Sequence, residues 1–368
     1  MNAVAARSGG GTVRLRELAS SLARVGPRHR YLFAVRKELA GVVADRAPSA
    51  EILSPPAAFD RVPARLLWEH VRLPRIAASW APDVVFSPFN VLPVRWPEPR
   101  PKLALIVSNL APYAGEVRRM YRGKERLRLE ALKWLTDRSL EHADRVFLLS
   151  TQAFDLIDPG ILDGRAEVIS MAPPSTAGLP ASGTSAGPFF VIVSDLLRYK
   201  GIELAIDALA ALEGDRPSLL ICGSALDGRY AARLRDQAER LGVSDQVRFL
   251  GPLDHQVVLG LFRSCVACIV PSRFENKSRV PVEAMAMGAP VIASDLVTFR
   301  ESCGDAALYF DLARPHTQLA AHMKHLLHDG KLRHRVGEAG AARLGAMRHT
   351  EATEQILASL ERLAAGPA

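Results

Sequence analysis

The chain has 368 residues, of which 48% are hydrophobic and 23% are charged, a composition that excludes a disordered chain. Its length favours two domains over a single core. The formal net charge of +8 makes nucleic acid a partner to consider, but the basic residues are scattered apart from one cluster at Arg118–Arg128. None of the sequence patterns of the common nucleic-acid-binding modules is present, so we expect no nucleic-acid partner.

The sequence also bears on location and redox chemistry. No apolar run approaches the roughly 18–20 residues that cross a bilayer, and Met1–Arg7 lacks the features of a secretory signal, so we expect a cytoplasmic protein. Cys265 and Cys268 form a Cys-x-x-Cys pair without a second pair or a nearby His. We therefore favour buried thiols in a reducing compartment over a redox or metal pair.

Short β-branched or apolar runs alternate with longer stretches of helical period along the whole chain. The expected strands are Tyr31–Val35, Val84–Ser87, Leu103–Val107, Arg145–Leu149, Phe189–Val193, Ser218–Cys222, Gln246–Leu250, Ala267–Val270 and Pro290–Ala293. The expected helices include Val13–Val25, Arg126–His142, Gly201–Leu212 and Asp227–Leu241. This alternation predicts an α/β protein with parallel sheets, and the length predicts two of them.

A segment rich in Pro, Gly, Ser and Thr at 172–187 separates two αβ halves of similar size and is expected to be a linker. We expect an N-terminal domain at 1–171 and a C-terminal domain at 188–349, with a last helix at 350–368 that packs back on the first domain. Ligands of open α/β sheets bind beyond the carboxyl ends of the strands, so two facing sheets would form a cleft.

The N-terminal half begins with a glycine loop, Ser8-Gly-Gly-Gly-Thr-Val13, before the first expected helix. Amides at such a loop, including those of Gly10 and Gly11, can contact a phosphate or an acceptor. A flexible strand–helix turn explains the same residues equally well.

The strongest signal runs from Val270 to Asp295. A strand ends at Val270, an irregular turn follows, Pro281 begins a helix, and Gly288 ends it. Glu275 is expected in the turn and Glu283 in the first turn of the helix. Carboxylates there can accept hydrogen bonds from sugar hydroxyls, and the amides at the helix start can hold a diphosphate.

This segment, Pro-Ser-x-x-Glu followed by Pro-x-Glu-Ala-Met-Ala-x-Gly-x-Pro-Val-Ile-Ala-Ser, resembles the donor site of glycosyltransferase family four. The resemblance implies a GT-B fold, in which two Rossmann-like parallel-sheet domains face each other across a cleft. The C-terminal domain would bind a nucleoside-diphosphate sugar. The match covers the C-terminal half well and the N-terminal half thinly.

A second resemblance lies in Val193-Ser-Asp-Leu-Leu-Arg-Tyr-Lys-Gly. In the family, the lysine before this glycine binds the donor pyrophosphate, and Lys200 stands at that place. The family pattern also has a glycine and an arginine where this chain has Ser194 and Asp195. Arg198 is the candidate replacement for the missing arginine.

Further donor-site segments follow in the expected order. Leu219-Leu-Ile-Cys-Gly-Ser provides a turn at Gly223, and Val247-Arg-Phe-Leu-Gly resembles the loop, with Leu250 and Gly251, whose main chain holds the nucleotide base. Relatives often have a Gly-Phe-Gly-Leu loop after the first glutamate. Here that loop reads Asn276, Lys277, Ser278, Arg279 and Val280, so Lys277 and Arg279 are expected to supply charge instead.

One departure concerns the N-terminal domain. Many relatives have a histidine after the strand at 103–107, where it contacts the donor sugar, but this chain has Ser108 and Asn109. Asn109 can donate and accept hydrogen bonds but cannot act as an acid or base near pH 7. Asn109 is therefore expected at the reacting sugar in a role without proton transfer.

The family resemblance implies transfer of a sugar with retention at the anomeric carbon, without a bound metal or cofactor, in polysaccharide or glycoconjugate biosynthesis. Glu275 would orient the donor sugar, Glu283 would bind the ribose, and Lys200 with Arg198 would stabilise charge on the departing diphosphate. Two alternatives stay open. One is a sugar-nucleotide epimerase of the same fold, and the other is a non-catalytic subunit that binds nucleotide sugar.

The acceptor is expected to be a glycan or a lipid-linked glycan. Glu116–Arg128 mixes basic residues with Met120 and Tyr121, which fits peripheral contact with the inner face of a membrane. A solvated basic helix face is the alternative.

Overall fold

A computed structural model describes residues 1–6, 10–59, 61–169, 187–214, 216–347 and 352–366. The chain divides into two compact units. Unit 1 comprises Met1–Met171 and Thr350–Ala368, and unit 2 comprises Ala172–His349. The expected linker at 172–187 lies outside the described residues except for Gly187.

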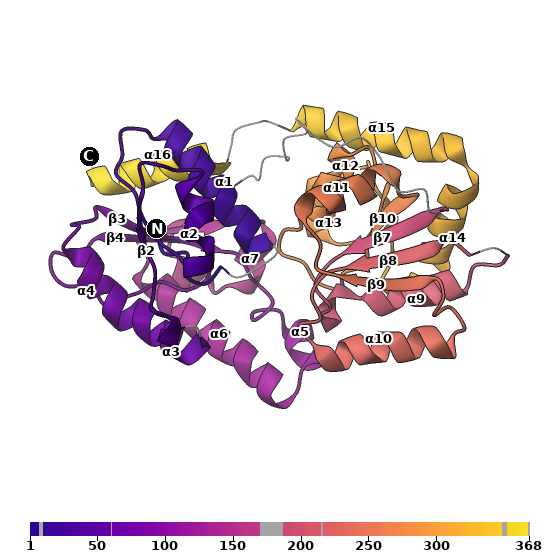
Figure 1. The fold of residues 1–368 in the computed structure, drawn as a ribbon, viewed down its shortest axis with the longest axis horizontal. Coiled ribbons are helices and arrows are strands. Elements are labelled where there is room, and N and C mark those ends of the chain that lie inside the picture. Colours follow the sequence, from indigo (N-terminus) through magenta and orange to yellow (C-terminus); the bar gives the residue numbers. More distant parts are fainter. Residues whose placement is uncertain (7–9, 60, 170–186, 215, 348–351, 367–368) are drawn as a thin grey trace. The chain divides into compact units, whose positions relative to one another are not determined.

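Unit 1 contains a parallel four-stranded sheet in the order β3-β4-β5-β6 and a parallel pair β1-β2 (Figure 1). Its strands are β1 (Leu32–Ala34), β2 (Glu51–Leu53), β3 (Val84–Ser87), β4 (Lys102–Val107), β5 (Arg145–Leu148) and β6 (Ala166–Val168). The main chain of Met1–Ala3 joins the two sets, because Asn2 N–H donates to Phe86 O at 2.8 Å and Ala3 N–H donates to Ala34 O at 2.8 Å. The first residues of the chain therefore lie between β1 and β3.

The helices of unit 1 connect these strands. They are α1 (Gly10–Val25), α2 (Lys37–Ala44), η1 (Ala57–Phe59), α3 (Val62–Leu67), the π-helix η2 (Trp68–Arg72), α4 (Leu73–Ala78), α5 (Gly115–Met120), α6 (Gly123–His142), α7 (Gln152–Leu156) and α8 (Pro159–Leu162). The first of them starts earlier than expected: Gly10 and Gly11 are its first residues and not part of a preceding loop. Their N–H groups still belong to the turn that lacks intrahelical acceptors.

The last helix, α16 (Ala352–Ala365), packs on unit 1. Its Ile356 lies in a buried cluster with Leu18, Phe86 and Phe147, and Leu357 lies in a second cluster with Leu15. Figure 1 shows α16 beside α1. The C-terminal end of the chain thus completes the core of the unit that contains the N-terminus.

Unit 2 contains a six-stranded parallel sheet in the order β12-β11-β10-β7-β8-β9. Its strands are β7 (Phe189–Val193), β8 (Ser218–Cys222), β9 (Val247–Gly251), β10 (Ala267–Val270), β11 (Val291–Ser294) and β12 (Leu308–Phe310). The chain builds outward from β7 in one direction and then returns to β10 on its other side. This reversal of strand order is the position at which doubly wound sheets bind ligands.

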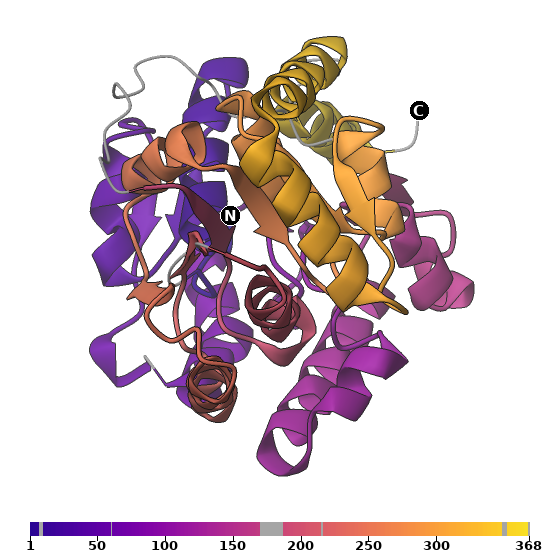
Figure 2. The same ribbon diagram turned by 90° about the vertical axis from the view of Figure 1, so that its right-hand side faces the viewer.

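Helices cover both faces of this sheet (Figures 1 and 2). They are η3 (Arg198–Lys200), α9 (Ile202–Ala210), α10 (Gly228–Arg240), α11 (His255–Ser264), α12 (Val280–Ala286), α13 (Val297–Cys303), α14 (Pro315–His328) and α15 (Gly330–Ala346). Neighbouring residues of a strand point to opposite faces, so Phe190 packs in the layer with α9, α10 and α14, whereas Val191 packs in the layer with α11, α12 and α13. Both layers are apolar, which explains the continuous hydrophobic strands of this half.

The four cysteines belong to this second layer. Cys222, Cys268 and Cys303 are buried in it, and Cys265 packs against it. Burial raises the pKa of Cys222, Cys265 and Cys303 to about 12 each. These thiols stay protonated near neutral pH and serve as small apolar side chains.

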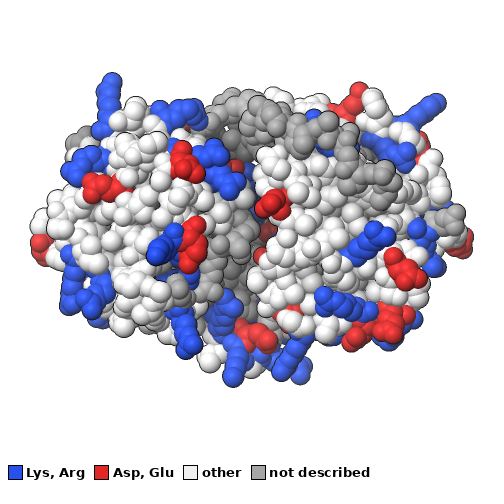
Figure 3. All heavy atoms as spheres, in the orientation of Figure 1, with Lys and Arg blue, Asp and Glu red and all other residues white. Residues whose placement is uncertain are grey.

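Charged side chains of both signs are spread over one face of the described residues. On the face drawn in Figure 3, Lys and Arg side chains are interspersed with Asp and Glu. On the described part of this face the basic side chains do not gather into one patch, in keeping with the scattered basic residues of the sequence.

Candidate functional site

The carboxyl edge of the sheet in unit 2 brings two of the expected site residues together. β7 and β10 are hydrogen-bonded neighbours at the reversal of strand order. Lys200 follows β7 on η3, and Glu275 follows β10 in the loop before α12. The Lys200 Nζ and Glu275 Oε2 atoms are 2.6 Å apart, so this pair spans the point where such sheets hold ligands.

The Lys200–Glu275 ion pair is largely shielded from solvent, with 18% and 12% of the two side chains exposed. Burial acts to lower the pKa of Lys200, but the neighbouring Glu275 carboxylate outweighs it and holds that pKa above its ordinary value. Lys200 is therefore charged throughout the neutral range. Among the described residues, the Lys200 ammonium group donates a hydrogen bond to Glu275. A phosphate that enters here would therefore meet a positively charged hydrogen-bond donor.

The loops that carry these two residues lie against each other. Gly201 has a φ of +63°, and a Cβ atom at this position would lie 2.2 Å from the Pro271 carbonyl oxygen. Arg273 N–H also donates to Tyr199 O at 2.8 Å. The Lys-Gly sequence is thus required by contact between loops, because a side chain at residue 201 would separate Lys200 from Glu275.

An ion pair that local sequence patterns do not predict fixes the same loops. Arg273 Nε and Nη2 lie 3.1 and 2.8 Å from Glu203 Oε1, and Glu203 stands in the first turn of α9, directly after Lys200-Gly201. Tyr230 Oη donates to the other Glu203 oxygen and accepts from Ile202 N–H at 2.9 Å. Arg273 lies within the Pro-Ser-x-x-Glu segment, but only the fold reveals its partner.

Arg198, the expected second phosphate ligand, is on η3 with Lys200. Its Nε atom is 3.0 Å from Asp227 Oδ2, and Asp227 also caps α10 by accepting from Tyr230 N–H at 2.9 Å. The guanidinium is therefore held beside a helix N-terminus, which favours anions.

Ser194 and Asp195, where the family pattern has glycine and arginine, directly follow β7. Both form hydrogen bonds with residues at the carboxyl end of β8. Asp195 Oδ1 accepts from Ser224 N–H at 3.0 Å, and Ser194 N–H donates to Cys222 O at 2.8 Å. A Cβ atom at Gly223 would lie 2.0 Å from Ser194 O, so glycine is needed where these strand ends meet. Gly223 N–H in turn donates to Gly251 O at 2.8 Å, which places two of the expected donor-site glycines next to each other. Leu250, before Gly251, is 39% exposed.

Glu283 lies in the first turn of α12 and is 6% exposed. Its Oε1 atom is 3.2 Å from Arg279 Nε and 3.4 Å from His255 Nε2. Burial acts to raise the pKa of Glu283, but the nearby His255 imidazole and the charge of Arg279 hold it below its ordinary value. His255, at the start of α11, was not identified from the sequence because it is near Glu283 only in the fold.

The remaining loop residues have different surroundings. Asn276 is 5% exposed, Ser278 is partly buried, and Val280 is the first residue of α12. Burial lowers the pKa of Lys277, and the charged groups that act on it are Glu301 of α13 and Arg343 of α15. Lys277 therefore interacts electrostatically with charged residues of α13 and α15.

In unit 1, Asn109 follows β4 at the carboxyl edge of the sheet. Buried Asn90, which was not predicted from the sequence, holds this turn: its Oδ1 atom accepts from Asn109 N–H at 2.8 Å, and its Nδ2 atom donates to Asn109 O at 2.8 Å. Asn109 Oδ1 accepts from Ala111 N–H at 2.9 Å. This side-chain oxygen is therefore engaged in the turn, whereas the side-chain nitrogen of Asn109 makes none of the hydrogen bonds found among the described residues.

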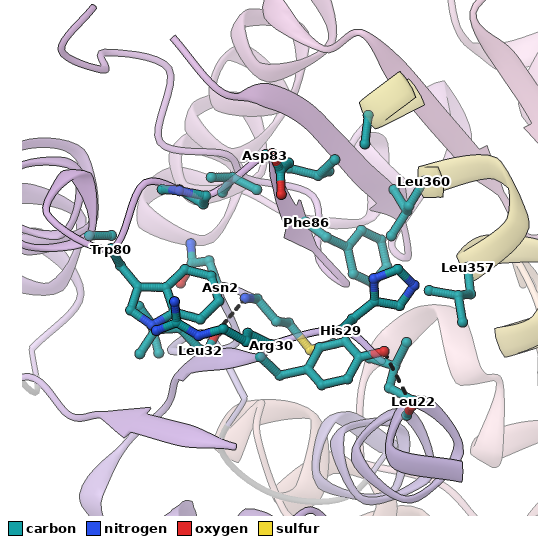
Figure 4. A pocket seen from close by; sticks show the side chains of 18 of the residues that line it. Asn2, Leu22, His29, Arg30, Leu32, Trp80, Asp83, Phe86, Leu357 and Leu360 are labelled. Carbon is teal, nitrogen blue, oxygen red and sulfur yellow. Dashed lines mark hydrogen bonds between the residues drawn. The ribbon is translucent and has the colours of Figure 1, made fainter. Parts of the chain in front are cut away.

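A cavity of about 170 Å³ in unit 1 lies at the opposite edge of the strands (Figure 4). It is lined by residues at the amino ends of β1 and β3, such as Leu32 and Val84, together with Trp80 and Leu360. Doubly wound sheets bind ligands at the carboxyl edge, so this cavity is distinct from the candidate site.

Two parallel-sheet units of this kind, with polar residues at the carboxyl edges of both sheets, define the GT-B class of folds. Solved structures agree. Sucrose-phosphate synthase from Thermosynechococcus elongatus superposes with a TM-score of 0.73 at 22% identity, covering 96% of this chain and 93% of that one. Anabaena Alr3699/HepE in complex with UDP-glucose gives a TM-score of 0.69 at 17% identity, covering 97% of each chain.

Sequence comparison finds relatives of the C-terminal half of the chain. The model described as "Glycosyl transferases group 1" matches residues 182–343. A D-inositol 3-phosphate glycosyltransferase from Corynebacterium jeikeium is 32% identical over 170 residues, which are 43% of this chain and 39% of that relative. The chain thus spans about two fifths of the length of this curated relative. The C-terminal half of the chain is thus similar to the group 1 glycosyl transferases, in agreement with the resemblance of its donor-site motifs.

Proposed function

We propose that this protein transfers a sugar from a nucleoside-diphosphate sugar to a glycan or lipid-linked acceptor, with retention at the anomeric carbon. The observation that carries the proposal is the Lys200–Glu275 pair at the reversal of strand order in unit 2. The match of residues 182–343 to the group 1 glycosyl transferases supports the reaction class, and the UDP-glucose complex of a protein with the same fold supports the donor class.

The donor would bind with its diphosphate at Lys200 and beside Arg198, and with its sugar at Glu275. The ribose hydroxyls would bind Glu283, and the base would lie against the main chain at Gly223 and Gly251. In this arrangement Lys200 interacts with the diphosphate as well as with Glu275. Glu275 then has acceptor capacity for sugar hydroxyls.

In the transfer step the bond between the anomeric carbon and the diphosphate oxygen breaks, and the acceptor oxygen forms a bond to the same carbon. The electron pair leaves with the diphosphate, which takes the acceptor proton. Lys200 stabilises the charge that develops on the leaving group, and such preorganised electrostatic stabilisation is commonly the largest catalytic contribution. We assign proton transfer to the leaving phosphate itself and invoke neither a protein base nor a metal or cofactor.

We place this reaction in polysaccharide or glycoconjugate biosynthesis in the cytoplasm, with peripheral contact at the inner face of the membrane where the acceptor is lipid-linked. Among the described helices, none is both long and apolar enough to cross a bilayer.

A thermal-shift panel of nucleoside diphosphates and their sugars, followed by product analysis with the stabilising donor, tests the proposal. We expect one nucleotide series to raise the Tm and that donor to release nucleoside diphosphate. A donor changed without loss of its nucleotide would identify an epimerase. Binding without transfer or hydrolysis would identify a non-catalytic subunit, and both results would contradict the proposal.

A further inference from the structure

Helix α6 of unit 1 has an exposed apolar side opposite its buried side. Thr136, Ser139 and Leu140 face the core and are buried. On the other side, Leu127 and Trp134 are 70% and 66% exposed. A surface helix normally presents polar residues there, so two large apolar side chains in water are unusual.

Lys124, Leu127, Ala131, Trp134 and Arg138 follow one another at spacings of three or four residues, and all five are exposed. They therefore form one stripe along α6, here called the α6 stripe. The stripe begins and ends with a basic residue, and Leu127 and Trp134 lie roughly 10 Å apart along the helix axis. Its composition is that of a helix that rests on a membrane surface, with apolar residues and a tryptophan between cations.

The charges around the α6 stripe favour an anionic partner. Residues 115–142 contain eight Lys or Arg and five Asp or Glu. Three of the acidic residues are already paired: Glu130 with Arg118, Asp137 with Lys133 and Glu141 with Arg138. In contrast, Arg122, Lys124 and Arg128 take part in none of the ion pairs or side-chain hydrogen bonds found among the described residues, and all three are exposed.

The apolar part of the α6 stripe is too narrow for a stable protein interface, which typically buries roughly 800 Å² per partner. Insertion of one tryptophan and one leucine at the level of lipid headgroups requires no such area, and each nearby Lys or Arg contributes roughly fivefold to binding of an anionic surface. We propose that the α6 stripe docks unit 1 on an anionic lipid surface. The biological role of this docking rests on the proposed function, because binding of the α6 stripe to a membrane would bring the enzyme to a lipid-linked acceptor.

The structure also changes which residues make the contact. Tyr121, the aromatic residue of the basic segment at 116–128, is only 6% exposed and cannot insert. Trp134 lies beyond that segment and was not expected from the sequence, since the charged residues around it give no sign of which side of the helix is exposed.

The test is sedimentation of the full chain with phosphatidylglycerol–phosphatidylcholine vesicles and with pure phosphatidylcholine vesicles. We expect binding to the anionic vesicles, weakening as salt is raised. The double variant L127S/W134S should lower this binding at least tenfold, and K124Q/R128Q should lower it by roughly 25-fold at low salt. The matched control is F154S, on α7 of the same unit, where an aromatic residue is 44% exposed; its binding should be unchanged.

Equal binding to both vesicle types, or full binding by L127S/W134S, would overturn the proposal. So would self-association of the wild type that L127S/W134S abolishes, because the stripe would then join two copies of the chain. The nucleotide thermal shift, measured on the same preparations, separates this result from the proposed function. Vesicle binding without any nucleotide binding would contradict the proposed glycosyl transfer and would still support the α6 stripe as a docking surface.

Discussion

Arg273 and Glu203 connect the two loops of the candidate donor site, with Arg273 Nε and Nη2 lying 3.1 and 2.8 Å from Glu203 Oε1. Arg273 is two residues from Glu275, and Glu203 is three residues from Lys200. The pair therefore sets the separation of the residues that we assign to the diphosphate and the sugar, without itself belonging to that set.

We expect R273Q and E203Q each to lower kcat/KM about tenfold or more, because a loop displaced by a fraction of an ångström misaligns the donor. Stability should change by less than about 1 kcal/mol, since both side chains are partly exposed. Steady-state kinetics and urea unfolding of both variants measure these effects. The swapped double variant E203R/R273E should recover part of the activity, and additive losses in that variant would show that the two residues act separately.

Lys200 and Glu275 should have separable kinetic effects. K200Q removes a charged donor to the diphosphate and should weaken nucleoside diphosphate binding by roughly 10- to 100-fold. E275Q should leave that binding within a few fold and lower kcat by roughly 100-fold. Calorimetry with the diphosphate and turnover with its sugar distinguish the two effects. Undiminished transfer by both variants would remove the basis of the donor-site assignment.

Gly201→Ala tests the contact between the loops. Its left-handed conformation costs an alanine about 1–2 kcal/mol, and a Cβ atom 2.2 Å from the Pro271 carbonyl oxygen forces the loops apart. We expect more than about 2 kcal/mol of destabilisation together with loss of donor binding. Gly41→Ala on α2 is the control, since no atom lies within 4 Å of its added Cβ and a helical alanine is preferred by roughly 0.5–1 kcal/mol. Urea unfolding compares the two, and equal stabilities would contradict the close approach of residue 201 to Pro271.

Glu283 predicts a pH dependence of stability. Its pKa is held below the ordinary value of 4.5 by His255 and Arg279, which outweigh burial. The folded state thus favours the carboxylate, and its contribution is fully present above pH 4.5 and lost as the pH falls through the folded value. We expect the Tm of the wild type to fall more steeply below pH 4.5 than that of E283Q. Parallel Tm profiles of the two proteins would show that Glu283 is not linked to stability.

How far the sequence predicts the fold depends on burial. Val84–Ser87, Phe189–Val193, Ser218–Cys222 and Ala267–Val270 have the bounds expected from the sequence, because strands buried on both faces read as continuous apolar runs. The three-residue strands β2, β6 and β12 were not predicted. β2 is Glu-Ile-Leu with its glutamate exposed, and such a short, partly exposed segment has no periodicity to detect.

Some residues of the candidate site could be predicted from the sequence and others could not. Glu275, Glu283 and Lys200 could be predicted as site residues because their neighbours in the chain form recognisable motifs, and these predictions remain to be tested. Arg273, His255 and Asn90 could not be assigned, because each acts through a partner distant in the sequence: Glu203, Glu283 and the main chain of Asn109. Such pairings depend on how loops meet in the fold, which local patterns do not encode.

The return of α16 to unit 1 has a consequence for dissecting this protein. A fragment cut after residue 171 would lack Ile356 and Leu357 and would leave Leu18 and Phe86 open to water. Separate production of unit 1 therefore requires grafting 352–365 onto it, whereas unit 2 can be excised as one uninterrupted piece. Deletion of only the last turns of α16 should likewise destabilise unit 1, which contains the half of the chain that is synthesised first.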